Sequence, residues 1–330
     1  MKKQHNYFTI IILFFVLTAI PTVYYFPRLL NLIHEPAKLL DLFLTTSNIK
    51  SFSFKFIFTS TVVFLSAALL DLCVMGWNNC ALKRLFFTRN QSARGDLWCW
   101  LLSVFSLYDF FALLFSFGFF YVISSIIVKA GGFNLIQLIP VPILQFIVIF
   151  CLGDLKHYLW HRFMHKKPFW ELHKYHHSAT EFNLITTSRG HFIEKGFLIV
   201  FDSILFSLLG APVEYFIAFI IIKEFYDQLL HSELNWSLGW VGRNILMSPK
   251  AHRIHHSDHH EFYDKNFGTM FIFWDKLFGT YIDTNTKITI GVDHNQYNKN
   301  GFWWDMLEGS RAFASTTKHM IKQKISSLKQ

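Results

Sequence analysis

The chain has 330 residues, of which 52% are hydrophobic and 16% charged, and its mean hydropathy is +0.30. A soluble domain carries about 25% charged residues, so the composition excludes an ordinary soluble protein and indicates a membrane protein. The formal net charge is +9, yet the basic residues form no aromatic-interleaved stripe, which argues against a nucleic-acid partner. The basic residues of the C-terminal tail are Lys318, Lys322, Lys324 and Lys329. They indicate either contact with anionic lipid headgroups or a basic end that is simply solvated.

Four apolar runs occupy the first half of the chain, at about residues 7–26, 54–75, 97–128 and 133–153. Each is long enough to form a helix that crosses a bilayer. No small-residue cleavage site follows the first run, so we interpret it as a membrane anchor and not as a signal peptide. Pro140 and Pro142 bend the helix of the fourth run or mark its start.

Basic residues predict how these spans are oriented. Lysines precede the first run, and four basic residues follow the second: Lys83, Arg84, Arg89 and Arg94. The positive-inside rule places both groups in the cytoplasm, and four spans then return the chain to the cytoplasmic side before residue 154. The four cysteines form no Cys-x-x-Cys pair, so they predict neither a disulfide framework nor a zinc ribbon and favour a reducing compartment.

From residue 154 onward the chain becomes polar and rich in histidine, and thirteen of its seventeen histidines lie between positions 157 and 260. The first group continues the fourth apolar run. Asp154, His157, His161 and His165 follow one another at i, i+3, i+7 and i+11, which is one face of a continuing helix. A turn at Pro168 ends this segment.

Two further groups share a spacing of i, i+3 and i+4. The second consists of His173, His176 and His177, and the third consists of His252, His255 and His256. The third group follows Pro249, a residue suited to a first helical turn. With His161 and His165, the three groups supply eight nitrogen donors, more than one four-coordinate zinc ion uses, so the spacing predicts two metal ions.

A fifth apolar stretch, residues 196–222, separates the second group from the third. It is interrupted at Gly210-Ala-Pro212. This pattern predicts two short helices, a hairpin that dips into the membrane, or one kinked span.

The identity of the metal follows from the donor type and from one missing residue. Imidazole suits iron, zinc, copper and nickel. The zinc-hydrolase signature His-Glu-x-x-His is absent, because Arg162 follows His161 where that signature has its general-base glutamate. A redox-active pair of irons therefore fits better than a hydrolytic zinc site.

About two fifths of the chain, residues 154–281, resembles the fatty acid hydroxylase and sterol desaturase superfamily of membrane non-haem di-iron oxygenases. The matching segments are Trp160-His-Arg-Phe-Met-His165, Trp170-Glu-Leu-His-Lys-Tyr-His-His-Ser178, Pro249-Lys-Ala-His-Arg-Ile-His-His256, Asn266-Phe-Gly268 and Trp274-Asp-Lys-Leu-Phe-Gly-Thr-Tyr281. The resemblance implies about four transmembrane helices under a cytosolic helical cap. It also implies two iron ions, O2 as co-substrate, a lipid or sterol substrate and a reduced electron-donor protein.

The resemblance adds a ninth ligand, His231 in His231-Ser-Glu-Leu-Asn235. Some members carry one more histidine four residues earlier; Asp227 stands there and either binds metal or orients His231. The expected metal ligands are thus His161, His165, His173, His176, His177, His231, His252, His255 and His256. Each imidazole needs a partner for its second ring nitrogen, and the candidates near the dimetal centre are Asp154, His157, His191, Glu194, Asp227 and Asp258. His259 and His260 are interpreted as surface residues.

The sequence therefore predicts an all-α polytopic membrane protein with about four transmembrane helices and a cytosolic cap that carries the histidines. Its expected parts are transmembrane helices in 1–153, a catalytic region in 154–285 with a membrane-associated hairpin near 196–222, and a basic tail in 286–330. The expected activity is O2-dependent hydroxylation of a lipid, in preference to desaturation, in the bacterial inner membrane or the endoplasmic reticulum. Electrons are expected from a separate protein, since no haem or flavin domain is present. The alternative is a non-catalytic membrane protein in which the histidine cap binds structural zinc.

Overall fold

The computed structural model describes residues 46–87, 90–105 and 133–328 apart from residue 211, together with a few single positions between 107 and 130. Within these residues every regular element is a helix, and the only strand-like pairings are two isolated bridges, Leu246 with Phe271 and Ser257 with Ile290. The all-α prediction is confirmed for this part of the chain. The first apolar run and most of the third lie outside the described residues.

Among the described helices, α9 (Pro142–Met164) is the one that is long and apolar enough to cross a membrane. Ile143, Leu144 and Ile147 are exposed on its first half. In the fourth run the prolines mark the start of the long helix, one of the two alternatives left open by the sequence, and a short 3-10 helix, η1 (Leu135–Leu138), precedes them. Pro142 then opens α9, because a first-turn residue needs no hydrogen-bonding N–H. The part of α4 (Thr46–Met75) whose side chains are described, Ser60–Met75, is apolar but shorter than a span, so the count of four spans is not confirmed.

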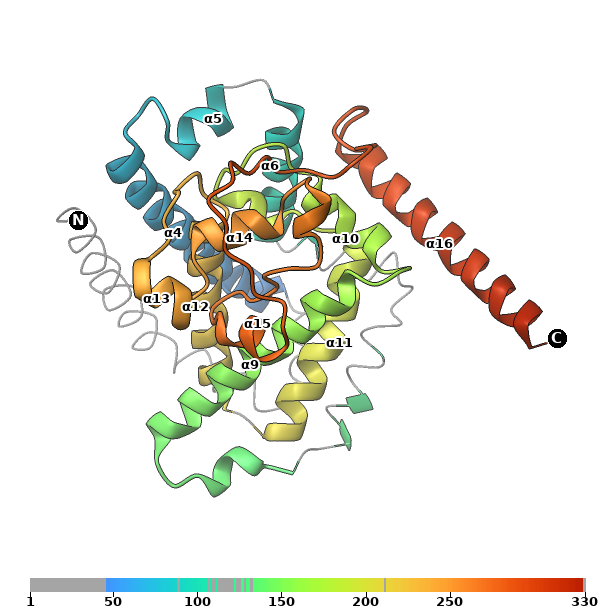
Figure 1. Ribbon diagram of the computed structural model, residues 1–330. Helices are drawn as coiled ribbons and strands as arrows, with labels where there is room; N and C mark the ends of the chain where they lie inside the picture. The colour runs from blue at the N-terminus through green and yellow to red at the C-terminus, as the bar shows by residue number, and fades with distance from the viewer. Residues whose placement is uncertain are drawn as a thin grey trace.

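The interrupted stretch at 196–222 forms two separate helices, α11 (Phe192–Leu209) and α12 (Val213–Leu230). Gly210 turns the chain with φ +61°, and a Cβ there would lie 2.2 Å from Asn134 Oδ1. Helix α9 packs on both helices, and α4 packs on α12 (Figure 1). At Gly153 a Cβ would come within 3.0 Å of the Phe219 ring, so the glycine lets α9 and α12 approach closely.

We use the name cap for these short helices: α5 (Ala81–Phe87), α6 (Gln91–Val104), α10 (Trp170–His177), η2 (Ile185–Ser188), α13 (Gly239–Asn244), α14 (Pro249–His255), η3 (His260–Phe262) and α15 (Phe273–Leu277). The Ser248 side chain accepts from the Ala251 N–H and fixes the start of α14. Tyr226 and Leu230 of α12 pack against Met247, Ala251 and Ile272. This cluster joins the cap to the long helices.

The last element, α16 (Phe302–Ser327), begins against α10 and then projects from the body of the molecule (Figure 1). The segment expected only as a basic tail thus contains a helix of 26 residues.

Candidate metal centre

Four segments, two of them at the ends of long helices, bring the nine predicted ligands to one place. His161 lies on α9 and His165 caps its C-terminus; α10 carries three more; His231 caps α12; and α14 with its cap residue carries the last three. All nine side chains are buried, including that of His165, although His165 as a whole residue is half-buried. The imidazoles therefore meet in the interior, under the short helices of the cap.

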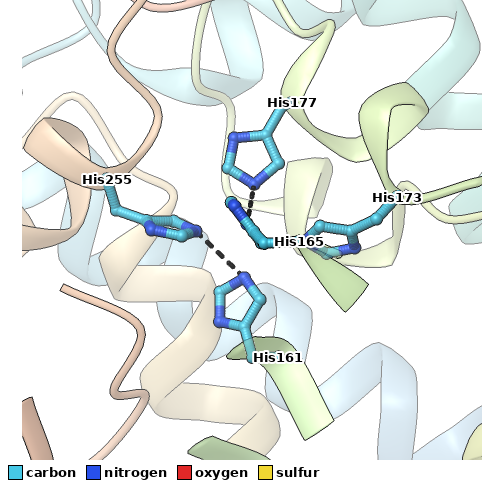
Figure 2. A group of neighbouring side chains, drawn as sticks. All are labelled: His161, His165, His173, His177 and His255. Carbon is cyan, nitrogen blue, oxygen red and sulfur yellow. Dashed lines mark hydrogen bonds between the residues drawn. The ribbon is translucent and has the colours of Figure 1, made fainter. Parts of the chain in front are cut away.

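The nine rings fall into two groups. The first metal group holds His161, His165, His173, His177 and His255, whose ligand atoms all lie within 4.8 Å of one another (Figure 2). The second metal group holds His176, His231 and His256, by the same criterion. His252 adjoins the second group, with its Nε2 3.1 Å from that of His231.

Adjacent histidines face different groups. His177 and His255 belong to the first metal group, whereas their neighbours His176 and His256 belong to the second. Successive residues on a helix point about 100° apart, so a pair of adjacent histidines can serve two ions on either side of the helix. Helices α10 and α14 each contribute rings to both groups in this way.

In six of the nine imidazole rings, Nδ1 is held by a hydrogen-bond partner. Four donate to backbone carbonyl oxygens: His161 to Phe267 at 2.9 Å, His176 to Arg189 at 2.8 Å, His231 to Asp227 at 2.8 Å and His255 to Lys265 at 2.7 Å. Two meet carboxylates: His165 at Asp264, 3.2 Å, and His173 at Glu194, 2.8 Å. A carbonyl oxygen only accepts, so Nδ1 carries the proton in the first four rings, and in the neutral ring Nε2 keeps a free lone pair.

These lone pairs face one another within each group. The Nε2 atoms of His161 and His255 are 2.9 Å apart, and those of His176 and His231 are 3.3 Å apart. Two neutral acceptors at this distance repel unless a cation lies between them. Metal–nitrogen bonds of about 2.0–2.1 Å put neighbouring ligands about 2.8–3.4 Å apart, from octahedral to tetrahedral angles, which matches both pairs. The Nε2 of His173 and both ring nitrogens of His256 are also buried without a hydrogen-bond partner.

Burial keeps these imidazoles neutral. It lowers the pKa of His177, His255 and His256 well below the ordinary value, and neighbouring histidines lower it further. The pKa of His165 is lowered to about 4, mainly by burial, although Asp264 opposes the shift. Neutral imidazole is the form that binds a metal ion. The first group alone offers five nitrogen donors, one more than a structural zinc ion takes, so the donor set fits two transition-metal ions.

Comparison with known proteins supports the same chemistry. Residues 146–280 match the family model described as fatty acid hydroxylase. This stretch, about two fifths of the chain, is similar to the fatty acid hydroxylase family, and we call it the fatty acid hydroxylase region. No solved structure gives a significant match to the chain.

Curated relatives match about two fifths of the chain. The chain is 35% identical to alkylglycerol monooxygenase of Caenorhabditis elegans over 40% of the chain and 26% of the relative. It is 34% identical to ornithine lipid hydroxylase OlsE of Rhizobium tropici, over 38% of each. It is 29% identical to cholesterol 25-hydroxylase of Homo sapiens, over 40% of the chain and 50% of the relative. The chain thus spans between a quarter and a half of the length of these relatives.

Three of the residues proposed to support the ligands lie on the long helices of the fatty acid hydroxylase region. Asp154 accepts from the N–H groups of Met270 and Phe271, at 3.0 and 3.1 Å, and from Trp274 Nε1, so it ties α9 to the cap. His157 lies one turn before His161, with ring centroids 6.2 Å apart, and belongs to neither group.

Asp227 uses its backbone and its side chain differently. Its carbonyl oxygen accepts from His231 Nδ1, while its carboxylate pairs with Lys223 on the same helix. The Asp227 side chain lies in neither metal group.

The remaining three candidates differ in their distance from the groups. Glu194 Oε1 meets His173 Nδ1 directly at 2.8 Å. His191 lies 2.8 Å from the Met306 carbonyl and accepts from the Ile193 N–H, so it connects α11 with α16. Asp258 accepts from Thr289 at the surface and has no hydrogen bond to any of the nine rings. The side chains of His259 and His260 are 39% and 78% exposed, outside both groups.

Sequence reasoning missed a buried support around Arg189. The Arg189 guanidinium pairs with Asp96 at 2.7 Å, donates to the Tyr175 carbonyl at 2.8 Å and lies 4.2 Å from the centre of the Tyr175 ring. Asp96 also accepts from Asn183 and Thr186. These contacts join α6, α10 and the segment 183–189, and they hold the carbonyl that receives His176.

Backbone carbonyls have no side-chain signature, so the partners of four rings were not readable from the sequence. Asp264 was missed because it lies 99 positions from His165 in the chain. The one sequence signal for a role of Arg189 was its position close to His191 and Glu194, which were both candidate residues.

Proposed function

We propose that this protein is a membrane-bound di-iron oxygenase that hydroxylates a lipid, fatty acyl or sterol-like substrate with O2. The observation that carries the proposal is the pair of histidine groups, each with free lone pairs at ligand spacing. The names of the relatives point to alkylglycerol, ornithine lipid and cholesterol as substrates of monooxygenases or hydroxylases. They favour hydroxylation over desaturation.

We assign one iron ion to the first metal group and the other to the second metal group together with His252. When bound, the two irons supply the redox chemistry that activates O2, and zinc can take the same nitrogen donors during purification. The chain's own task is to hold neutral Nε2 atoms in place, which the fixed Nδ1 atoms support. Electrons are proposed to come from a separate donor protein.

Aromatic rings beside both metal groups limit the access of water to them. The Phe267 ring lies 4.9 Å from the His165 ring and 5.5 Å from that of His255. The Phe182 ring lies 5.2 Å from the His231 ring and 5.0 Å from that of His256. A centre that activates O2 needs such an apolar lining, because excluding water prevents side reactions of its reactive intermediates.

The proposed membrane arrangement places transmembrane helices in 1–153 and the histidine-box region in 154–285, with the cap facing the cytoplasm. The membrane is the bacterial inner membrane or the endoplasmic reticulum. The exposed apolar half of α9 supports a span that enters the membrane below the metal centre. Helices α11 and α12 pack beside it as a membrane-associated hairpin, so a lipid can reach the centre laterally from the bilayer.

The proposal is tested with protein purified without oxygen and loaded with iron. We expect iron bound at both groups and O2 consumption that depends on an added lipid and yields a hydroxylated product. His260→Ala, a change at an exposed histidine outside both groups, serves as the matched control and keeps full activity. Less than about one iron per chain, with full zinc occupancy and no O2 consumption alongside any lipid, contradicts the proposal.

The competing function is a structural zinc cap without catalysis. His176→Ala separates the two, because His176 lies in the second metal group and is buried. Loss of turnover in a folded protein supports the oxygenase. Loss of folding alone, with no activity in the parent protein, supports the structural role. The names of the relatives do not favour it.

A further inference from the structure

Helix α16 has one half that packs and one half that does not. In its first half, the Phe313 ring lies 5.8 Å from that of Phe169 beside α10, and Tyr297 just before the helix donates to the Glu171 carbonyl. From residue 318 to residue 328 every residue is exposed. This half projects beyond the rest of the described protein (Figure 1).

The outer side of α16 carries an apolar stripe along its whole length. We call this the α16 stripe; its members are Trp303, Leu307, Ala314, Ile321, Ile325 and Leu328. At 3.6 residues per turn these positions fall within about 60° of one another on the helix surface. Each is exposed, including Ile321 at 54% and Leu328 at 76%. The spacing is that of an amphipathic helix. Trp303, at the start of the stripe, lies 5.1 Å from the Phe111 ring, whereas Ile321, Ile325 and Leu328 are exposed in the projecting half of the helix.

Basic side chains flank the stripe. Arg311, Lys318 and Lys322 follow one edge, and Lys324 lies at the other. The helix has two acidic residues, Asp305 and Glu308, both in its first two turns. A row of lysines beside an apolar stripe suits a bilayer surface, because the alkyl stems cover apolar surface while the ammonium groups reach lipid phosphates.

We propose that the α16 stripe lies in the interfacial layer of an anionic bilayer, with the flanking lysines and arginine on the lipid headgroups. Charge complementarity selects this occupant. A second copy of α16 packed on the same face would bring its own lysines against these, and like charges repel. Because the first half of the helix is fixed on α10, the docked helix would also hold the metal-bearing cap at a set height above the membrane.

The test uses the full-length protein in lipid nanodiscs and needs no metal or turnover. In a background with Cys73→Ser and Cys151→Ser, a single cysteine is introduced by Ile321→Cys on the stripe or by Gln323→Cys on the opposite face. Each is labelled with an environment-sensitive fluorophore. Both positions are exposed, so neither change disturbs the core. The parent protein without an introduced cysteine is treated with the same fluorophore, and its signal shows how much label reaches the buried Cys80 and Cys99.

We expect the label at 321 to shift to the blue and to be quenched by nitroxide-bearing lipids in nanodiscs that contain phosphatidylglycerol, while the label at 323 stays in water. Raising the salt concentration weakens the effect. Replacing Lys318, Lys322 and Lys324 with glutamine lowers the ratio of docked to free helix about fivefold for each lysine. Two outcomes overturn the proposal: both labels remain water-exposed in every lipid, or the label at 321 is shielded without lipid quenching and in proportion to protein concentration, as a second copy would shield it.

Discussion

At the scale of single residues, the two ring nitrogens of a histidine have different roles in the metal centre. Nδ1 is held by a carbonyl or a carboxylate, and Nε2 is left free to face its group. The fixed nitrogen sets both the tautomer and the angle of the ring. The partners of Nδ1 therefore contribute to metal affinity alongside the ring nitrogens that would bind the ion.

Glu194 offers a direct test of the role of the Nδ1 partners. Its carboxylate meets His173 Nδ1 at 2.8 Å, and no other partner holds that nitrogen. We expect Glu194→Ala to weaken metal binding by about 10–100-fold, the range found when a partner of a ligating histidine is removed. Competition with a chelator measures the affinity. Asp258→Ala, which removes a surface carboxylate remote from the rings, is the control, and an equal effect of the two changes would refute the role of Glu194.

The lowered pKa values predict how the metal-free protein responds to acid. Burial lowers the pKa of His165 to about 4 from an unfolded value near 6.5, so between these pH values the unfolded chain binds more protons than the folded one. Stability is then full above about pH 6.5 and falls as the pH drops toward 4. His165 alone accounts for about 3 kcal/mol over this window. Thermal unfolding of the metal-free protein from pH 7 to 4 measures the loss; a flat profile contradicts it.

At the scale of elements, the spacing of histidines was readable from the sequence because it is local to a helix. Helices α9, α10 and α14, with their C-cap residues, carry the histidines that the i, i+3 and i+4 intervals singled out. Which rings share an ion depends on long-range packing, and hydropathy does not encode it. The start of the helix at Pro142, and the choice of two helices at 196–222, also depended on packing, since Gly210 lies directly against Asn134.

Adjacent histidines should have separable effects on metal content. His177 lies in the first metal group and His176 in the second. We expect His177→Ala and His176→Ala each to lose about one of two metal ions. The two variants should differ in which ion remains, and element analysis together with the spectrum of a bound cobalt probe distinguishes them. Loss of both ions in both folded variants, or of neither, would show that the rings do not form two sites.

The buried Arg189–Asp96 pair should be essential for the shape of the cap. Neither side chain reaches solvent, and together they hold the carbonyl that receives His176. Asp96→Asn leaves the guanidinium without its counter-charge, and removal of one partner of a buried pair costs about 3–5 kcal/mol. Asp283→Asn, which breaks the more exposed pair with Lys250, should cost about 0–1 kcal/mol. Thermal or denaturant unfolding compares the two, and similar losses would contradict the assignment.

At the scale of the whole molecule, the short helices bring two metal groups together beside the long helices α9 and α12. The fatty acid hydroxylase region holds every predicted ligand, and α16 extends from it along the proposed bilayer surface. The family assignment could be read from the ordered histidine segments. The substrate could not, because it depends on side chains that the long helices turn toward the centre, and hydropathy does not specify them.

The number of metal ions bound per chain tests the central claim most directly. The protein is purified without oxygen, loaded with ferrous iron, freed of loosely bound metal and analysed for iron, zinc and protein. Two groups of neutral imidazoles predict two tightly bound ions per folded chain. A single ion per chain, unchanged when His176 or His231 is replaced by alanine, would contradict a dimetal centre.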